Sequence, residues 1–206
     1  MLKTLARLNT AALVLALSLS PGIAQYATAA PRATAAAATS IHIDNFGQIS
    51  PAYYRGAQPQ GRDYADLAAL GVKALINLTS DDASPDEKAM AEKAGLAYFQ
   101  IPMTTHAVPT LAQLTQFMKI VNDPANQPVY VHCVGGRHRT GVMTAAYRMA
   151  HDSWTADRAF NEMKQYKFGA DFLHAEFKQF VYSYRPETLH ADAAAAPVVS
   201  TKTGGQ

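Results

Sequence analysis

The stretch VYVHCVGGRHRTG, residues 129–141, joins an apolar strand to a helix through a loop that carries two glycines, two arginines and the only cysteine of the chain. Residues 129–133 have the β-branched and aromatic composition of a buried strand. Arg139 opens a segment with helical periodicity that extends to residue 151. A strand that turns into a helix through a glycine-rich loop is typical of the ligand-binding edge of an α/β fold.

Alternating elements extend outward from this stretch. The apolar periodicity predicts strands at 71–78 and 97–101 and helices at 64–70, 84–95, 110–122, 155–166 and 171–184. Ser84–Glu87 has the pattern of a capping box, and the apolar residues of the last helix, Phe172 and Leu173 among them, are assigned to the core. The alternation predicts an α/β fold in three layers, with a mainly parallel central sheet and helices on both faces.

The N-terminal segment has the composition of a signal peptide. Lys3 and Arg7 precede an apolar run at 11–20, and small residues follow it. Residues 1–30 are therefore expected to be a signal peptide that is cleaved near 24–29. The run is too short to serve well as a membrane anchor. We expect a mature protein that leaves the membrane and is exported, to the periplasm or to the extracellular space.

The rest of the chain divides by composition into three parts. Residues 31–40 are expected to be a flexible lead-in, residues 41–188 one domain, and residues 189–206 a disordered tail. Without residues 1–24 the chain has 16 basic and 16 acidic side chains. A balanced charge predicts no nucleic-acid partner, because such a surface needs a clustered basic excess. One cysteine excludes an intramolecular disulfide, and a free thiol in an exported protein is open to oxidation, so Cys133 requires a chemical explanation.

The loop after this cysteine has the features of an anion site. Ligands of parallel α/β sheets bind beyond the carboxyl ends of the strands, where Cys133 lies. The amides that can converge on one point there belong to Val134, Gly135, Gly136, Arg137 and His138. The two glycines allow the backbone angles of a tight nest, and the dipole of the next helix adds positive potential. Arg139 returns to the mouth of this ring, where its planar fork can hold two oxygens of a tetrahedral oxyanion.

The same positive field favours the thiolate of Cys133, which is the nucleophilic form of the side chain. His132 can orient the loop through a hydrogen bond, and Thr140 Oγ can stabilise the thiolate when it leaves a phosphocysteine. The alternative of a packed cysteine beside solvated arginines is disfavoured by the combination of these residues. The loop is therefore predicted to bind a phosphate group and to attack it with sulfur.

The arrangement His132-Cys133-(five residues)-Arg139-Thr140 resembles the signature of the cysteine-dependent protein tyrosine phosphatases. Four segments are similar, in the same order, to the atypical dual-specificity phosphatases: NFGQISPAYYRGAQP (45–59), LAALGVKALINL (67–78), AGLAYFQIPM (94–103) and CVGGRHRTG (133–141). The resemblance covers most of residues 41–184. It implies a phosphoric monoester hydrolase that needs no cofactor and no metal.

The resemblance also implies roles for single residues. Cys133 is expected to be the nucleophile, Arg139 the phosphate clamp, and residues 134–138 the backbone cradle. Arg55 matches a family position and is expected either to brace the loop or to lie on the surface. Arg137 and His138 are expected either to favour an acidic substrate at the mouth or to be solvated.

The expected proton donor is missing. Phosphatases of this kind usually protonate the leaving oxygen with an aspartic acid on a loop before the cysteine, but here that loop reads IPMTTHAVPT (101–110), with Thr105 at the matching position. His106 is a tentative donor, because imidazole transfers protons near neutral pH. Asp81 or Asp82, after the strand 71–78, is the other tentative donor. Both alternatives stay open, as does a plain role for each as a solvated loop residue.

Three classes of function are compatible with these residues. The first is a secreted phosphatase of phosphorylated proteins, with a variant that hydrolyses small phosphate esters such as inositol phosphates. The second is a rhodanese-type sulfurtransferase, but that ring usually places the arginine one position earlier, where this chain has His138. The third is a non-catalytic phosphate-binding module, which would need Arg139 but not Cys133. We adopt the phosphatase.

Overall fold

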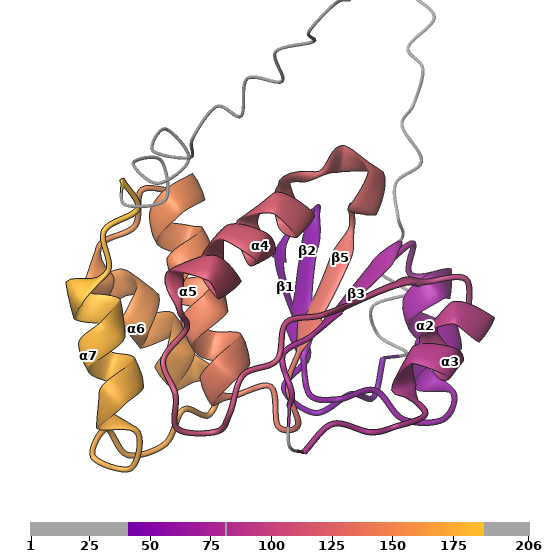
Figure 1. The fold of residues 1–206 in the computed structure, drawn as a ribbon, viewed down its shortest axis with the longest axis horizontal. Coiled ribbons are helices and arrows are strands. Elements are labelled where there is room, and N and C mark those ends of the chain that lie inside the picture. The colour runs from indigo at the N-terminus through magenta and orange to yellow at the C-terminus, as the bar shows by residue number, and fades with distance from the viewer. Residues whose placement is uncertain (1–40, 81, 188–206) are drawn as a thin grey trace, which may run out of the picture. The chain divides into compact units, whose positions relative to one another are not determined.

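The computed structural model describes residues 41–80 and 82–187; the expectations for residues 1–40, for Asp81 and for the tail 189–206 lie outside the described residues. A five-stranded sheet in the order β1-β2-β5-β3-β4 runs through the described part (Figure 1). Its strands are β1 Gly47–Ser50, β2 Tyr53–Gly56, β3 Ala74–Asn77, β4 Ala97–Gln100 and β5 Val129–His132. All neighbours are parallel except β1 and β2, an antiparallel edge pair that the sequence reading did not anticipate.

The helices cover both faces of this sheet (Figure 1). Helices α2 (Asp63–Ala69) and α3 (Glu87–Lys93) lie on one face, and a second group, α4 (Leu111–Asn122), α5 (His138–His151), α6 (Ala156–Gln165) and α7 (Ala175–Ser183), lies on the other. A short 3₁₀ turn, η1 (Pro124–Asn126), precedes β5. Successive strand residues serve opposite cores, as the pleat requires: Leu75 and Tyr130 pack with α2 and α3, and Ile76 and Val131 pack with the second group. The predicted three-layer α/β fold is confirmed.

The register brings three strand ends together at one edge. His132, the last residue of β5, pairs with Gly56 of β2 on one side and with Asn77 of β3 on the other. Because β5 is hydrogen-bonded on both sides and covered on both faces, all four of its residues are buried. Cys133 therefore follows the most enclosed strand of the sheet, at the edge where ligands bind in parallel α/β proteins.

One predicted helix start is wrong. The Ser84–Glu87 capping box does not form, because α3 begins at Glu87, its N-cap is Asp86, and no side chain caps it. The Glu87 side chain turns inward instead and is fully buried. The helix with a capping box is α4, where Thr110 and Gln113 bond each other's backbone amides.

The core assignment of Phe172 and Leu173 is also wrong. Helix α7 begins only at Ala175, and both residues lie in the preceding turn, where Phe172 is 80% exposed. Asp171 anchors this turn through ion pairs with Lys164 and Lys178. The turn therefore presents its next two residues to solvent, whereas Phe177 and Val181 of α7 are buried as predicted and Phe180 is partly buried.

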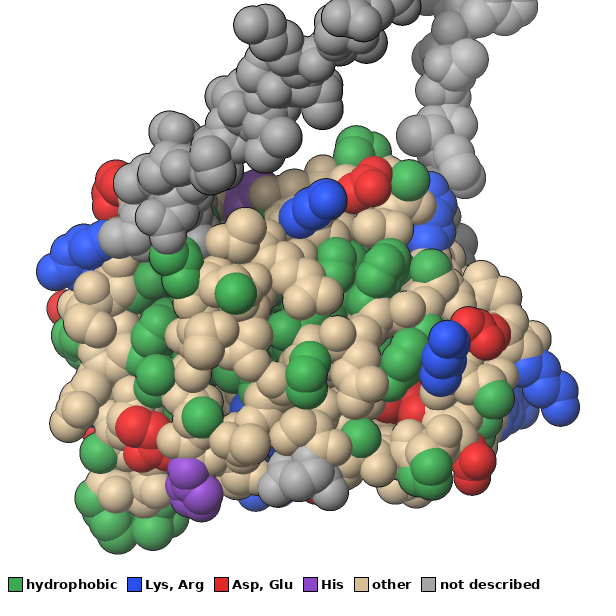
Figure 2. Space-filling view, viewed as in Figure 1, with side chains coloured by type: hydrophobic (Ala, Val, Ile, Leu, Met, Phe, Trp, Pro, Cys, Tyr) green, Lys and Arg blue, Asp and Glu red, His purple; other side chains and the backbone are tan. Residues whose placement is uncertain are grey.

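The surface shows no segregation of charge on the face drawn in Figure 2, where acidic and basic side chains of the described residues are interspersed around small hydrophobic groups. Within the described ranges, none of the helices has the length and apolar character needed to cross a bilayer.

Candidate active site

Cys133 lies at the base of a pocket of about 250 Å³ at the carboxyl edge of the sheet. The described residues that line it are Asp82, Thr105, Cys133, Val134, Gly135, Arg137, His138 and Arg139. The cysteine is buried, whereas Val134 beside it is 47% exposed and forms an apolar part of the lip. The structure thus places the predicted nucleophile, Arg139 and four of the five predicted cradle residues around one cavity; Gly136 is the cradle residue that is not among its described lining residues.

Carbonyl groups of the loop 133–138 are held away from this cavity. Asn45 Nδ2 donates to the carbonyl oxygens of Gly135 and Gly136 at 3.3 and 3.1 Å. Arg55 Nη2 donates to the Gly136 carbonyl at 2.5 Å, and the Gln58 amide donates to the Val134 carbonyl at 3.1 Å. In a planar trans peptide the C=O and the following N–H point in opposite directions. Fixing these three carbonyls outward therefore directs the next three amides toward the pocket, as an anion cradle requires.

Arg55 is the buried brace of this loop. Its side chain is fully buried and its guanidinium lies 4.0 Å from the centre of the Tyr166 ring. Burial lowers the pKa of this guanidinium from its ordinary value, but arginine remains protonated at neutral pH. Arg55 therefore adds a positive charge behind the loop as well as a hydrogen bond, and the surface alternative for this residue is wrong.

Gly136 is the position where the loop needs glycine. Its φ is +62°, in the left-handed region, and a Cβ built there would lie 2.3 Å from the backbone of Gly56. Gly135 has no such backbone angle, and an added Cβ would meet only the Arg137 side chain at 3.5 Å. Of the two glycines that the sequence singled out, Gly136 is thus the one that the nest demands.

Arg139 is buried, and its guanidinium binds the carboxylate of Asp82. Its Nη1 and Nη2 donate to Asp82 Oδ1 and Oδ2 at 2.8 and 2.6 Å, and Nη1 also donates to the Met103 carbonyl at 3.0 Å. The hydrogen bond from Arg139 lowers the pKa of Asp82. The two carboxylate oxygens occupy the fork as two oxygens of a phosphate would.

A buried polar network lies beneath His132. The carboxylate of Glu87 accepts hydrogen bonds from Asn77 Nδ2 and from Tyr64 Oη, the latter at 3.4 Å. His132 Nε2 lies 3.1 Å from Glu87 Oε1. The ring nitrogens of His132 do not meet hydrogen-bond geometry in this position. The network therefore places a buried carboxylate beside the residue that precedes Cys133, without a hydrogen bond to its ring.

Thr140 and His138 occupy the start of α5. Thr140 is buried, and its Oγ1 has no hydrogen-bond partner among the described residues, so it is available to a group in the loop. His138 Nε2 lies 2.9 Å from the Phe168 carbonyl. Arg137 extends toward Asp44, with 3.8 Å between Nη2 and Oδ2. The side chains of Arg137 and His138 are thus partly engaged by neighbours outside the cradle.

The tentative proton donors lie in different surroundings. Asp82 lines the pocket, and Thr105 lines it from the loop 101–110. His106 is not among the described lining residues; it is 72% exposed and pairs with Glu176, with 3.5 Å between Nδ1 and Oε1. Asp81 lies outside the described residues.

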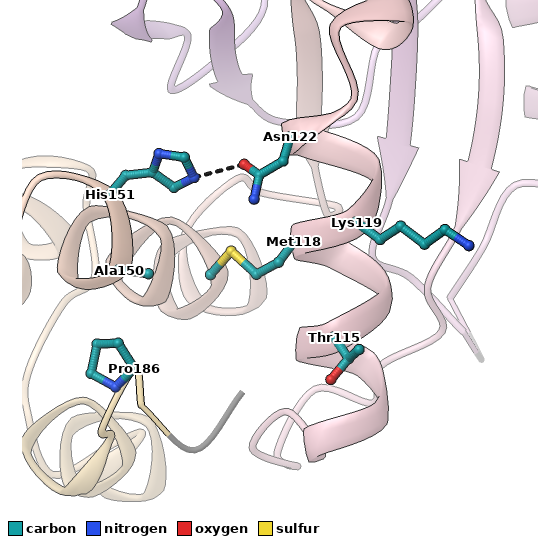
Figure 3. Close-up of a pocket in the computed structure, with 7 residues that line it drawn as sticks. All are labelled: Thr115, Met118, Lys119, Asn122, Ala150, His151 and Pro186. Carbon is teal, nitrogen blue, oxygen red and sulfur yellow. Dashed lines mark hydrogen bonds between the residues drawn. The ribbon is translucent and has the colours of Figure 1, made fainter. Parts of the chain in front are cut away.

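Another concavity, of about 320 Å³, lies between α4 and α5 (Figure 3). Asn122 and His151 close one end of it with a 2.6 Å contact, and Met118 lies toward its middle. Lys119, the only cation among its described lining residues, extends away from it in Figure 3. The described lining of this pocket contains neither a thiol nor converging donors, and in this it differs from the Cys133 pocket.

Sequence reasoning missed two supports of the site. Asn45 has a positive φ of 59° and binds the loop from the start of the domain; asparagine adopts this conformation readily, but nothing in the sequence relates it to residues some 90 positions later. Glu87 lies in the first turn of α3, where an acidic residue is common at the surface. Its sequence position therefore gave no indication that its carboxylate is buried and accepts hydrogen bonds.

Known proteins match this chain over the same region. A family model described as "Tyrosine phosphatase family" matches residues 40–202. The dual specificity protein phosphatase TpbA of Pseudomonas aeruginosa is 30% identical over 142 residues, which cover 69% of this chain and 63% of TpbA. The inositol diphosphatase SIW14 of Saccharomyces cerevisiae is 26% identical over 154 residues, which cover 72% of this chain and 54% of SIW14. The chain therefore spans less than two thirds of either relative.

Solved structures show the same fold. The crystal structure of P. aeruginosa TpbA matches with a TM-score of 0.62 at 26% identity, over 73% of this chain and 91% of that chain. The core catalytic domain of SIW14 in complex with citrate matches with a TM-score of 0.63 at 24% identity, over 74% of this chain and 93% of that chain.

Proposed function

The chain belongs to the tyrosine phosphatase family, and from this premise we propose that it is an exported phosphatase that hydrolyses phosphotyrosine in proteins through a phosphocysteine intermediate. The observation that carries the proposal is the position of Cys133 beneath a ring of amides whose carbonyls are held outward, with the fork of Arg139 at the same pocket. A binding module would need the ring but not the thiol.

The proposed reaction has two steps. The Cys133 thiolate attacks phosphorus, an S–P bond forms, the P–O bond of the ester breaks, and the leaving oxygen takes up a proton. Water then attacks the phosphocysteine, inorganic phosphate leaves, and the thiolate is restored. The loop amides and Arg139 stabilise the charge on the phosphoryl oxygens throughout, and Thr140 Oγ1 is available to donate to the departing sulfur.

Asp82 is the proton donor that we propose. It is the carboxylate among the described lining residues, but its bond to Arg139 keeps it ionised in the free enzyme. A bound phosphate dianion competes for the same fork and places negative charge beside the carboxylate. Both effects raise its pKa, so substrate binding itself favours the protonated form that can donate.

The lining of the pocket supports phosphotyrosine over a substrate with many phosphates. Arg137 and Arg139 are the arginines among the described lining residues, and each faces a carboxylate, Asp44 or Asp82. A densely phosphorylated inositol would bring these carboxylates against further negative charge. The exposed side chain of Val134 offers an apolar contact to an aromatic ring instead. A solved structure of a TpbA variant is described as a complex with pTyr.

Inositol diphosphates remain the second candidate, because SIW14 is described as an inositol diphosphatase. The test compares kcat/KM of the full chain for a phosphotyrosine peptide, a phosphoserine peptide and a diphosphoinositol, with Cys133→Ser as the blank. We expect phosphotyrosine to be preferred by at least about tenfold. A preference for the diphosphoinositol would replace this substrate assignment with the second candidate.

Export is proposed from the N-terminal segment alone. Expression of the chain with its own N-terminus, followed by fractionation, is expected to yield a shortened protein outside the cytoplasm. A full-length protein retained in the cytoplasm would contradict this part of the proposal.

A further inference from the structure

Three potential metal ligands meet beside the catalytic pocket. His106 comes from the loop between β4 and α4, His174 is the N-cap of α7, and Glu176 lies in the first turn of that helix. Their ligand atoms all lie within 4.8 Å of one another, and within the described residues this is the one group of three metal-ligating side chains with such spacing. The group joins two segments that are distant in sequence.

Two of the three ligand spacings agree with a tetrahedral ion. Zinc bonds of 2.0–2.2 Å to nitrogen and oxygen place neighbouring ligand atoms about 3.3–3.5 Å apart. The distance from Glu176 Oε1 is 3.5 Å to His106 Nδ1 and 3.3 Å to His174 Nδ1. Two imidazoles and one carboxylate also form a ligand set that suits zinc and leaves one position for water.

The surroundings hold the set while leaving it accessible. The His174 ring packs against the His138 ring in a tilted arrangement with 3.7 Å between centroids, and it stacks on the His106 ring with 5.1 Å between centroids. His174 is largely buried and therefore fixed, whereas His106 is mostly exposed and open to an ion from solvent. We propose that His106, His174 and Glu176 form a binding site for a divalent transition-metal ion of the zinc class.

The position of the site gives the ion a structural consequence. Thr105, the neighbour of His106, lines the catalytic pocket, and so does His138, whose ring packs against His174. A bound ion would tie the loop 101–110 to the start of α7 and fix this side of the mouth. The proposal does not rest on the phosphatase assignment, because the ligands lie outside the thiol pocket.

Direct binding is measured in the full chain carrying Cys133→Ser, because a thiolate would itself bind zinc. Titration with Co²⁺, followed by visible absorption, reports tetrahedral coordination, and calorimetry with Zn²⁺ reports affinity and number of sites. We expect one ion per chain. His106→Ala and Glu176→Gln should each weaken binding by about 100-fold or more, since loss of a mere outer partner already costs 10–100-fold.

His151→Ala is the matched control, because His151 lies at the separate pocket between α4 and α5 and should leave affinity unchanged. Melting temperatures in EDTA verify that each variant folds, and Zn²⁺ should raise the melting temperature of the control but not of the ligand variants. The proposal is wrong if the parent chain binds no ion at micromolar concentrations, or if His106→Ala binds as tightly as His151→Ala.

Discussion

The two loops that border the catalytic pocket are held in opposite ways. The loop after β5, residues 133–138, has its carbonyls bound by the buried Arg55, by Asn45 and by a backbone amide. The loop after β4, residues 101–110, is anchored at its start by the buried Met103, but its tip is exposed, and His106 there contacts Glu176 and the His174 ring. In the proposed reaction, the groups that act on every phosphate ester therefore lie on or directly after the loop 133–138, the rigid loop of the two, whereas the tip of the loop 101–110 is lightly held.

The first way to test this contrast is to remove the nucleophile from the rigid loop. Cys133→Ser should lower turnover by more than about 10⁴-fold, because a serine hydroxyl stays protonated in the same field and does not attack. Binding of phosphate or vanadate should persist, because the amide ring is unchanged. Rates come from phosphate release and binding from calorimetry; substantial turnover in this variant would disprove the covalent mechanism.

The second test keeps the positive charge at position 139 and removes the planar guanidinium group. Arg139→Lys should lower kcat/KM by about 10²–10³-fold on every ester, because one ammonium cannot replace a planar two-point donor. The variant also loses the bidentate grip on Asp82. A nearly normal rate would mean that the guanidinium does not contact the phosphoryl group.

The third test distinguishes the two candidate proton donors, Asp82 in the loop after β3 and His106 in the loop 101–110, by how strongly each depends on the leaving group. Asp82→Asn should slow phosphotyrosine by about 10²-fold and an activated nitrophenyl ester much less, since a better leaving group needs less proton transfer. The decrease in kcat toward alkaline pH should also disappear in this variant. His106→Ala, assayed in EDTA, is the paired variant and should cost only a few-fold on both esters. If His106 instead shows the leaving-group dependence, the donor belongs to the loop 101–110.

Acid stability provides an independent check on the Asp82–Arg139 pair. The pKa of Asp82 is lowered from its ordinary value of 3.8, so the pair stabilises the fold above that pH and is lost as the pH falls through the lowered pKa. The Asp82 side chain is 35% exposed, so solvent screening keeps this contribution to stability small.

The fourth test distorts the backbone of the rigid loop without changing any side chain that takes part in the proposed reaction. Gly136→Ala should lower kcat/KM about 10–10²-fold, because the new Cβ collides with the Gly56 backbone and displaces the amide ring. Gly135→Ala is the matched control and should be milder, since its Cβ meets only the Arg137 side chain at ordinary distance. Equal losses in the two variants would contradict the role given to the positive φ of Gly136.

The contrast between the two loops also explains which parts of the fold and of the site could be predicted from the sequence. The strand at 129–133, the helices and the ring from Cys133 to Arg139 are encoded locally, by periodicity and by residues within one loop. Asn45 donates a hydrogen bond to that ring from a distant segment, and no local sequence pattern predicts this contact. The bond between Asp82 and Arg139 spans 57 positions and could not be chosen over His106 from spacing alone. The core assignment of Phe172 was wrong for a related reason: its apolar periodicity continues into α7, but a turn held by the ion pairs of Asp171 separates it from that helix.

The central position of β5 links function to the cooperativity of folding. Its amides are enclosed by β2 and β3, so their exchange with solvent deuterium should require opening of the whole sheet, whereas amides at the tip of the loop 101–110 should exchange through local fluctuations. Cys133, the proposed nucleophile, follows this strand directly. Inactivation and global unfolding in denaturant should therefore share one midpoint, and catalysis becomes a direct reporter of the intact native population.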